Sequence, residues 1–137
     1  ALDATAAERD DTRARIGALR DRLGEGLRRA VPGLVETAAD ADGRGGRLPG
    51  ICHVCIPGVD SESLLFLAET DGVYAAAAAS CASGAQQSSH VLAAMGVDAD
   101  LAAGALRLSL GWDSKDADVD LALEVLPAAI ERVRSFG

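Results

Sequence analysis

Two long segments of the chain repeat apolar residues at steps of three and four, which predicts an amphipathic helix in each. The first covers residues 2–31, and the second runs from a cap at Ser114 to about Phe136, with Pro127 inside it. The two apolar stripes are Ile16, Leu19, Leu23 and Leu27, and Val119, Leu123, Leu126, Ile130 and Val133.

Shorter apolar or alternating runs between these helices predict strands. They are Leu34–Ala38, Ile51–Ile56, Val73–Ala76 and Ala105–Leu110. Short helices are expected over residues 60–69, capped by Asp60, and over residues 89–95, with Asp98 capping a further turn. This order of elements predicts one α+β domain over residues 1–137, a small, largely antiparallel sheet with helices packed on one face.

Composition and charge narrow the class of protein. The chain is 49% hydrophobic but only 3% aromatic, so a core of Ala, Leu and Val is expected. Its net charge is −8, and the basic cluster at residues 13–29 is interleaved with acids, which disfavours nucleic-acid binding. No apolar run is long enough to span a bilayer, and the start does not resemble a signal peptide. Three cysteines, an odd number, favour a reducing, cytoplasmic setting.

Cys52 and Cys55 form a C-x-x-C pair inside a predicted strand. Residues three apart on a strand point to opposite faces, so the pair is poorly placed to chelate one metal ion. No second cysteine pair follows at the spacing of a zinc site. We therefore expect both thiols to pack in the core and expect no metal site.

Cys81 lies in the segment Ser80–Gly84, within a stretch of Ala, Ser, Gly and Gln that predicts a loop. A thiol in such a loop is expected to be exposed, which suits a carrier that takes up a group at one place and delivers it at another. Reactive cysteines also need an activating environment. No Lys or Arg lies between Arg47 and Arg107, and only His53 and His90 could supply a neighbouring cation. A catalytic Cys81 would therefore need a group that this chain lacks.

Arg107 lies in the middle of a predicted strand, and its side chain is expected on the face opposite Leu106, Leu108 and Leu110. Two interpretations stay open for it. The guanidinium covers a solvent-exposed sheet face, or it binds a carboxylate through two parallel hydrogen bonds.

Five segments together resemble the C-terminal small domain of cysteine desulfurases of the NifS/IscS type, in the class V aminotransferase family. They are Leu48–Leu65, Ser80–Gly84, Ser89–Leu92, Met95–Gly96 and Arg107–Gly111. Two of these segments carry motifs of chemical interest, Ser-Cys-x-Ser-Gly in Ser80–Gly84 and Arg-x-Ser-x-Gly in Arg107–Gly111. Both motifs occur here in the family's order and spacing. The similarity spans essentially the whole chain.

The resemblance implies a function. Such enzymes bind L-cysteine on pyridoxal phosphate, and a loop cysteine takes the sulfur as a persulfide, leaving alanine. Cys81 corresponds to that cysteine, and Arg107 to the residue that holds the substrate carboxylate. The persulfide then passes to sulfur acceptors such as iron–sulfur scaffold or tRNA-thiolation proteins. The full-length enzyme is expected to be a cytoplasmic homodimer.

The residues that hold pyridoxal phosphate in this family lie in a large domain that this chain lacks. The only lysine, Lys115, is not in the family's Ser-x-His-Lys setting, and the chain has no initiator Met. We therefore expect a fragment that is inactive alone, binds no cofactor itself and partners the domain carrying it. Alternatives are a persulfide carrier that works without the cofactor, a selenocysteine lyase and a class V transaminase.

Overall fold

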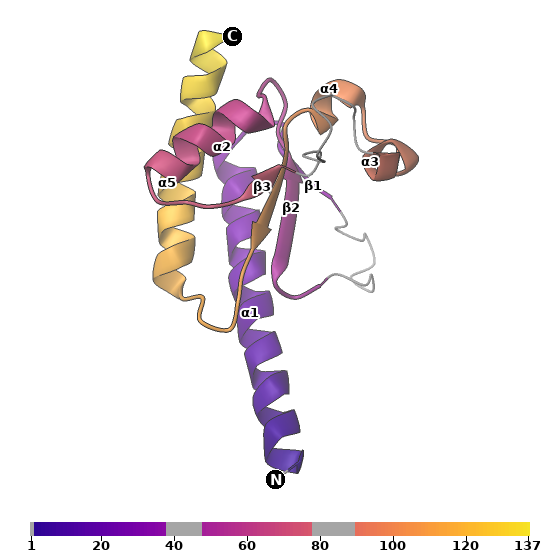
Figure 1. Ribbon diagram of the computed structural model, residues 1–137, viewed down its shortest axis with the longest axis vertical. Coiled ribbons are helices and arrows are strands. Elements are labelled where there is room, and N and C mark those ends of the chain that lie inside the picture. The colour runs from indigo at the N-terminus through magenta and orange to yellow at the C-terminus, as the bar shows by residue number, and fades with distance from the viewer. Residues whose placement is uncertain (1, 38–47, 78–89) are drawn as a thin grey trace.

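The computed structural model describes residues 2–37, 48–77 and 90–137 (Figure 1). It confirms the predicted α+β fold, a four-stranded antiparallel sheet with helices. The helices are α1 (Leu2–Ala30), α2 (Ser61–Thr70), α3 (His90–Ala94), α4 (Ala99–Ala102) and α5 (Asp116–Phe136). The strands are β1 (Val35–Glu36), β2 (Ile51–Cys55), β3 (Ala76–Ala77) and β4 (Ala105–Ser109). No helix within these ranges is long and apolar enough to cross a membrane.

The sheet has the strand order β1-β2-β4-β3, with every neighbouring pair antiparallel. β2 and β4 form its centre and pair along their whole length, from Ile51 opposite Ser109 to Cys55 opposite Ala105. The edge strands β1 and β3 have two residues each. The sheet therefore depends mainly on the pairing of β2 with β4.

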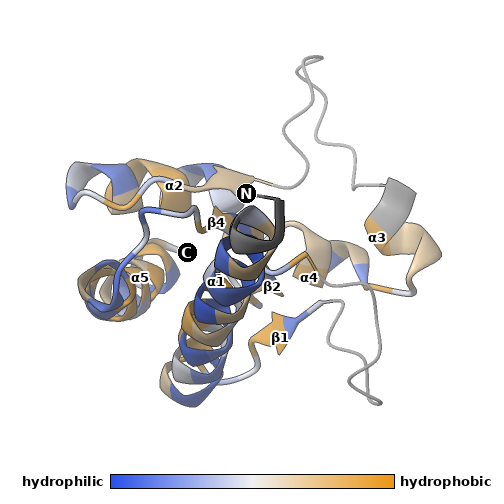
Figure 2. Ribbon diagram, turned by 90° about the horizontal axis from the view of Figure 1, so that it is seen from below, coloured by the Kyte–Doolittle hydropathy of each residue, from blue (hydrophilic) through white to orange (hydrophobic). Residues whose placement is uncertain are grey.

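α1, α2 and α5 cover one face of this sheet (Figure 2). Alternate residues of the two central strands point into that core, because side chains on a strand alternate between faces. The largest fully buried side chains of this core are Leu27, Val54, Ile56, Leu64, Leu106, Val119, Leu126, Ile130 and Cys52. Most of the two predicted stripes is confirmed in this core, with Leu123 and Val133 packed at its margin. Ile16, the first residue of the α1 stripe, is half-buried and lies outside the cluster.

The opposite face of the sheet carries a second, smaller cluster. Cys55 and Ala105 pack there against Leu92 of α3 and Ala102 of α4. These two short helices cover one end of the second face, so in the described part of the chain its remainder has no helix over it.

Two glycines allow close contact between elements. A Cβ atom added to Gly26 of α1 would lie 2.5 Å from Leu123 Cδ2 of α5, and one added to Gly104 would lie 2.0 Å from the carbonyl oxygen of Ile56. At Gly104 the obstacle is backbone, which cannot rotate away as a side chain can. The amide of Ile56 also donates to the Gly104 carbonyl (3.0 Å), so β4 begins against the end of β2.

Two predicted helix caps are confirmed. The carboxylate of Asp60 accepts a hydrogen bond from the amide of Ser63 (3.0 Å) at the start of α2, and that of Asp98 accepts from the amide of Asp100 (2.9 Å). The Ser63 hydroxyl also donates to the Asp60 carboxylate (2.6 Å), and this bond, followed by the one from the Ser63 amide, lowers the pKa of Asp60 because both stabilise its charged form.

The predicted cap at Ser114 is wrong by one residue. Lys115 is the N-cap of α5, and its amide donates to the Asp118 carboxylate (2.8 Å). The Ser114 hydroxyl instead accepts from the amide of Gly111 (2.9 Å), because these residues close a tight turn before the helix. α5 continues across Pro127.

The predicted third strand begins later than expected. Val73 is buried in the core, and its amide donates to the Ala68 carbonyl (2.9 Å), which closes the end of α2. The ladder with β4 therefore starts only at Ala76.

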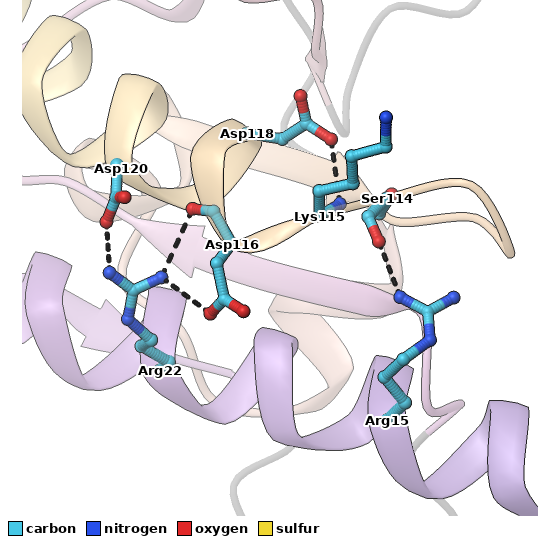
Figure 3. A network of polar contacts seen from close by, with 7 residues as sticks. All are labelled: Arg15, Arg22, Ser114, Lys115, Asp116, Asp118 and Asp120. Atoms are coloured by element: carbon cyan, nitrogen blue, oxygen red, sulfur yellow. Dashed lines mark hydrogen bonds and ion pairs between the residues drawn. The ribbon is translucent and has the colours of Figure 1, made fainter.

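Polar contacts join α1 to the start of α5 (Figure 3). Arg15 donates to the carbonyls of Ser114 (2.6 Å) and Trp112, and Arg22 pairs with Asp116 (3.1 Å) and Asp120. These groups are exposed, and exposed ion pairs contribute about 0–1 kcal/mol. They fix the alignment of two helices that the apolar core already holds together.

The close approach at Gly104 predicts that Gly104→Ala destabilises the fold. We expect a loss of about 1–3 kcal/mol in the free energy of unfolding, because β4 must move away from Ile56. Urea unfolding followed by far-UV circular dichroism measures this change. Gly17→Ala in α1 is the control: its added Cβ meets no atom within 4 Å, and a gain of about 0.5–1 kcal/mol is expected. An unchanged midpoint for Gly104→Ala would contradict the close approach.

Candidate functional site

The residues of β4 alternate between the two faces of the sheet as predicted. Leu106 and Leu108 are buried in the core, whereas Arg107 and Ser109 are exposed on the opposite face. Arg107 therefore lies at the centre of the sheet, on the face that the long helices do not cover.

Arg107 has a neighbour from the strand on each side. His53 of β2 and Ala76 of β3 are its cross-strand partners. Directly opposed residues of antiparallel strands have Cβ atoms about 4.5–5.5 Å apart. An imidazole thus borders the arginine on one side and a methyl group on the other.

Thr37, directly after β1, contacts His53 through its backbone and its side chain. The Thr37 amide donates to the His53 carbonyl (2.9 Å), and the Thr37 hydroxyl is hydrogen-bonded to Nδ1 of the imidazole. Within the described residues, no hydrogen bond to Nε2 is found. The ring is therefore held at one nitrogen and leaves the other available.

The electrostatics of the site follow from this arrangement. Burial lowers the pKa of His53 below its usual value, and the positive charge of Arg107 lowers it further. His53 is thus uncharged at neutral pH and does not supply the cation that the sequence suggested for activating Cys81. Arg107 has no ion pair with any residue that the structure describes. A single positive charge beside a neutral imidazole suits the binding of a carboxylate.

Cys81, the predicted nucleophile, lies outside the described residues. The chain runs toward it from β3, whose last residue, Ala77, is the cross-strand partner of Leu106. His90 begins α3, where the described chain resumes. The strand next to Arg107 is therefore the one from which the chain continues to Cys81.

Cys52 and Cys55 point to opposite faces, as predicted. Cys52 packs in the main core and Cys55 in the smaller cluster, and no disulfide joins the two. Burial raises the pKa of Cys55, which disfavours the reactive thiolate. Over residues 2–37, 48–77 and 90–137, no group of three or more His, Cys, Asp or Glu side chains is placed to hold a metal ion.

An open groove lies on the other side of the molecule, between α2 and the end of α5. Phe66 and Phe136 border it and are 73% and 80% exposed, and its lining includes the acidic residues Asp60 and Glu62. α2 and α5 cover the face of the sheet opposite Arg107, so this groove is separate from the arginine site.

The sequence singled out Arg107 but not Thr37 or the pairing of His53 with Arg107. The alternation of β2 indicates that His53 faces away from the core, and this signal was available. Its position beside Arg107 depends on the register between two strands that lie far apart in the chain.

Comparison with known proteins supports the resemblance. No protein-family model matches the chain. An IscS-like cysteine desulfurase of Mycobacterium tuberculosis is 44% identical over 125 residues, which cover 91% of this chain and 31% of that protein. The cysteine desulfurase IscS of Methanosarcina thermophila is 35% identical over 136 residues, which cover 99% of this chain and 32% of that protein. The chain therefore spans about a third of the length of these relatives.

Solved structures share the fold. A NifS-like protein superposes with a TM-score of 0.74 at 24% identity, covering 96% of this chain and 31% of its own. A NifS-like protein from Rickettsia africae gives a TM-score of 0.69 at 23% identity, covering 87% of this chain and 29% of its own. Over most of its length, the chain is homologous to the C-terminal part, about 30%, of IscS/NifS cysteine desulfurases.

Proposed function

We propose that this chain supplies the sulfur-accepting thiol, Cys81, and the carboxylate-binding side chain, Arg107, of a cysteine desulfurase. The observation that carries the proposal is the position of Arg107. It is exposed at the centre of the sheet, beside the strand from which the chain continues to Cys81. Cys81 is the fourth residue after Ala77, and four residues span at most about 14 Å.

The proposed reaction transfers one sulfur atom. L-Cysteine and the Cys81 thiol give L-alanine and a Cys81 persulfide, so that a sulfur–sulfur bond forms and the carbon–sulfur bond of the substrate breaks. Arg107 binds the substrate carboxylate through two parallel hydrogen bonds and fixes the orientation of the substrate. The persulfide then passes to an acceptor, for which an iron–sulfur scaffold or a tRNA-thiolation protein is the proposed class.

The described residues do not form a site for pyridoxal phosphate, the cofactor that the resemblance implies. Lys115, the only lysine of the chain, lies at the start of α5 (Figure 3). This helix packs on the face of the sheet away from Arg107. We propose that residues beyond this chain bind the cofactor, in an intracellular protein whose complete form is a homodimer.

Removing the thiol tests the role of Cys81. In the complete protein that carries this chain, we expect Cys81→Ser to lower the release of alanine from L-cysteine by about a hundredfold or more, because the serine hydroxyl is a far weaker nucleophile. Alanine and sulfide are both measured in the presence of a reductant. Cys55→Ala, which removes a buried thiol elsewhere, is the control. Parent-like alanine release from Cys81→Ser would exclude a persulfide on Cys81 as the route to alanine.

Changing the charge and shape of Arg107 tests the carboxylate site. We expect Arg107→Gln to raise the KM for L-cysteine by roughly ten- to a hundredfold, because charge-assisted hydrogen bonds to the carboxylate are lost. Arg107→Lys keeps the charge without the two-pronged geometry, and a smaller rise is expected. Arg29→Gln, which removes the same charge from an exposed position on α1, provides the matched comparison. An Arg107→Gln enzyme with the parent KM would show that the carboxylate binds elsewhere.

A further inference from the structure

We propose that Thr37 and His53 are positioning residues for Arg107: the Thr37 hydroxyl fixes the imidazole, and the imidazole borders the guanidinium and keeps it extended toward a carboxylate. This inference rests on the proposed role of Arg107 and adds two residues, one directly after β1 and one on β2. Nothing in the resemblance assigns a role to either of them.

The first step of the argument is the attachment of the imidazole. Thr37 binds both the backbone and the ring of His53, through its amide and its hydroxyl. Rotation of the ring would break the bond at Nδ1, and displacement of the strand would break the bond at the carbonyl. His53 is also half-buried, so surrounding atoms restrict it further. The imidazole of His53 is therefore held in one position beside Arg107.

The second step concerns the charged groups around the imidazole of His53. Among the described residues, Arg107 is the only charged group that faces the imidazole of His53. The other charged or titratable groups on the neighbouring elements point elsewhere or are neutral. On β1 the Glu36 carboxylate is turned toward α1, where it pairs with Arg28 (3.7 Å). On β2 the other group on this face is Cys55, whose raised pKa keeps it neutral.

An uncharged side chain beside Arg107 favours the binding of an anion by the guanidinium. An acidic side chain in place of His53 would pair with the guanidinium and compete with a substrate carboxylate. A second fixed cation would repel Arg107 and push it away from the sheet. An uncharged imidazole does neither, so the arginine keeps its full charge for a ligand and loses conformational freedom before the ligand arrives.

The third step connects ligand binding with His53. A carboxylate on Arg107 offsets the positive charge that lowers the pKa of His53, so the pKa should rise on binding, while burial continues to oppose it. The bound state then takes up a proton more readily than the free state. Carboxylate affinity should therefore increase as the pH falls into the range in which His53 takes up its proton.

The experiment uses the complete protein that carries this chain, labelled with carbon-13 at histidine Cε1, and propionate as the carboxylate. The His53 signal is assigned as the one lost in His53→Gln. Titration between about pH 5.5 and 7.5 should give a higher His53 pKa with saturating propionate than without it. Arg107→Gln should raise the pKa without propionate and remove the response to propionate.

Kinetics of the positioning variants provide the second measurement. Thr37→Val keeps the branched shape and removes only the hydroxyl, and we expect it to raise the KM for L-cysteine by about fivefold, the effect of one lost hydrogen bond, with little change in kcat. His53→Gln should act in the same direction. Thr70→Val, whose hydroxyl binds the Phe66 carbonyl (2.9 Å) in α2, is the matched control and should keep the parent KM.

The outcomes separate this inference from the proposed function. A raised KM for Arg107→Gln, together with parent values of KM and propionate affinity for Thr37→Val and His53→Gln, would overturn the inference and leave the role of Arg107 intact. A parent-like KM for Arg107→Gln would overturn both. A His53 pKa that does not respond to propionate in an enzyme that binds it would likewise exclude the coupling.

Discussion

The pairing of β2 with β4 is the interaction on which both the core and the candidate site depend. The same ladder directs Val54 and Leu106 into the core and His53 and Arg107 to the opposite face. Because side chains alternate along a strand, a slip of one residue would bury the arginine and expose the leucines. The burial of apolar side chains on one face therefore fixes the register of the polar groups on the other.

A second constraint is the small size of the side chains in this core. With few aromatic residues available, apolar surface is buried by bringing elements close together, and the chain uses glycine where they meet. Gly26 allows Leu123 of α5 to lie against the backbone of α1, and Gly104 allows β4 to begin against Ile56. Such packing leaves little free volume, so a displacement of either long helix would be transmitted to the sheet. The exposed arginine contacts between α1 and α5 contribute alignment more than stability.

The amino-acid sequence predicts this structure best where the determining signal is local. Alternation placed Arg107 and the two cysteines of the C-x-x-C pair on their faces, and side-chain chemistry located the cap at Asp60. Prediction from the sequence was wrong where tertiary contacts compete with local preference. At Ser114, for example, the hydroxyl closes a turn instead of capping a helix. The pairing of His53 with Arg107 is a long-range contact, and its register is decided by the packing of both strands against the helices. Cys81 lies outside the described residues, and its role stays a prediction.

The exposure of Arg107 sets a condition on any selective binding at this site. An ion pair between exposed groups contributes at most about 1 kcal/mol, because water screens the charges and competes for their hydrogen bonds. Orienting a ligand as small as the proposed substrate, L-cysteine, by its carboxylate requires more than this, and hence a site from which water is largely excluded. α3 and α4 already cover one end of this face around Cys55, and the described residues leave the part around Arg107 open. Selectivity at Arg107 therefore requires a covering surface that the described residues do not supply, and a fixed, neutral neighbour such as His53 keeps the guanidinium in place until that surface closes over it.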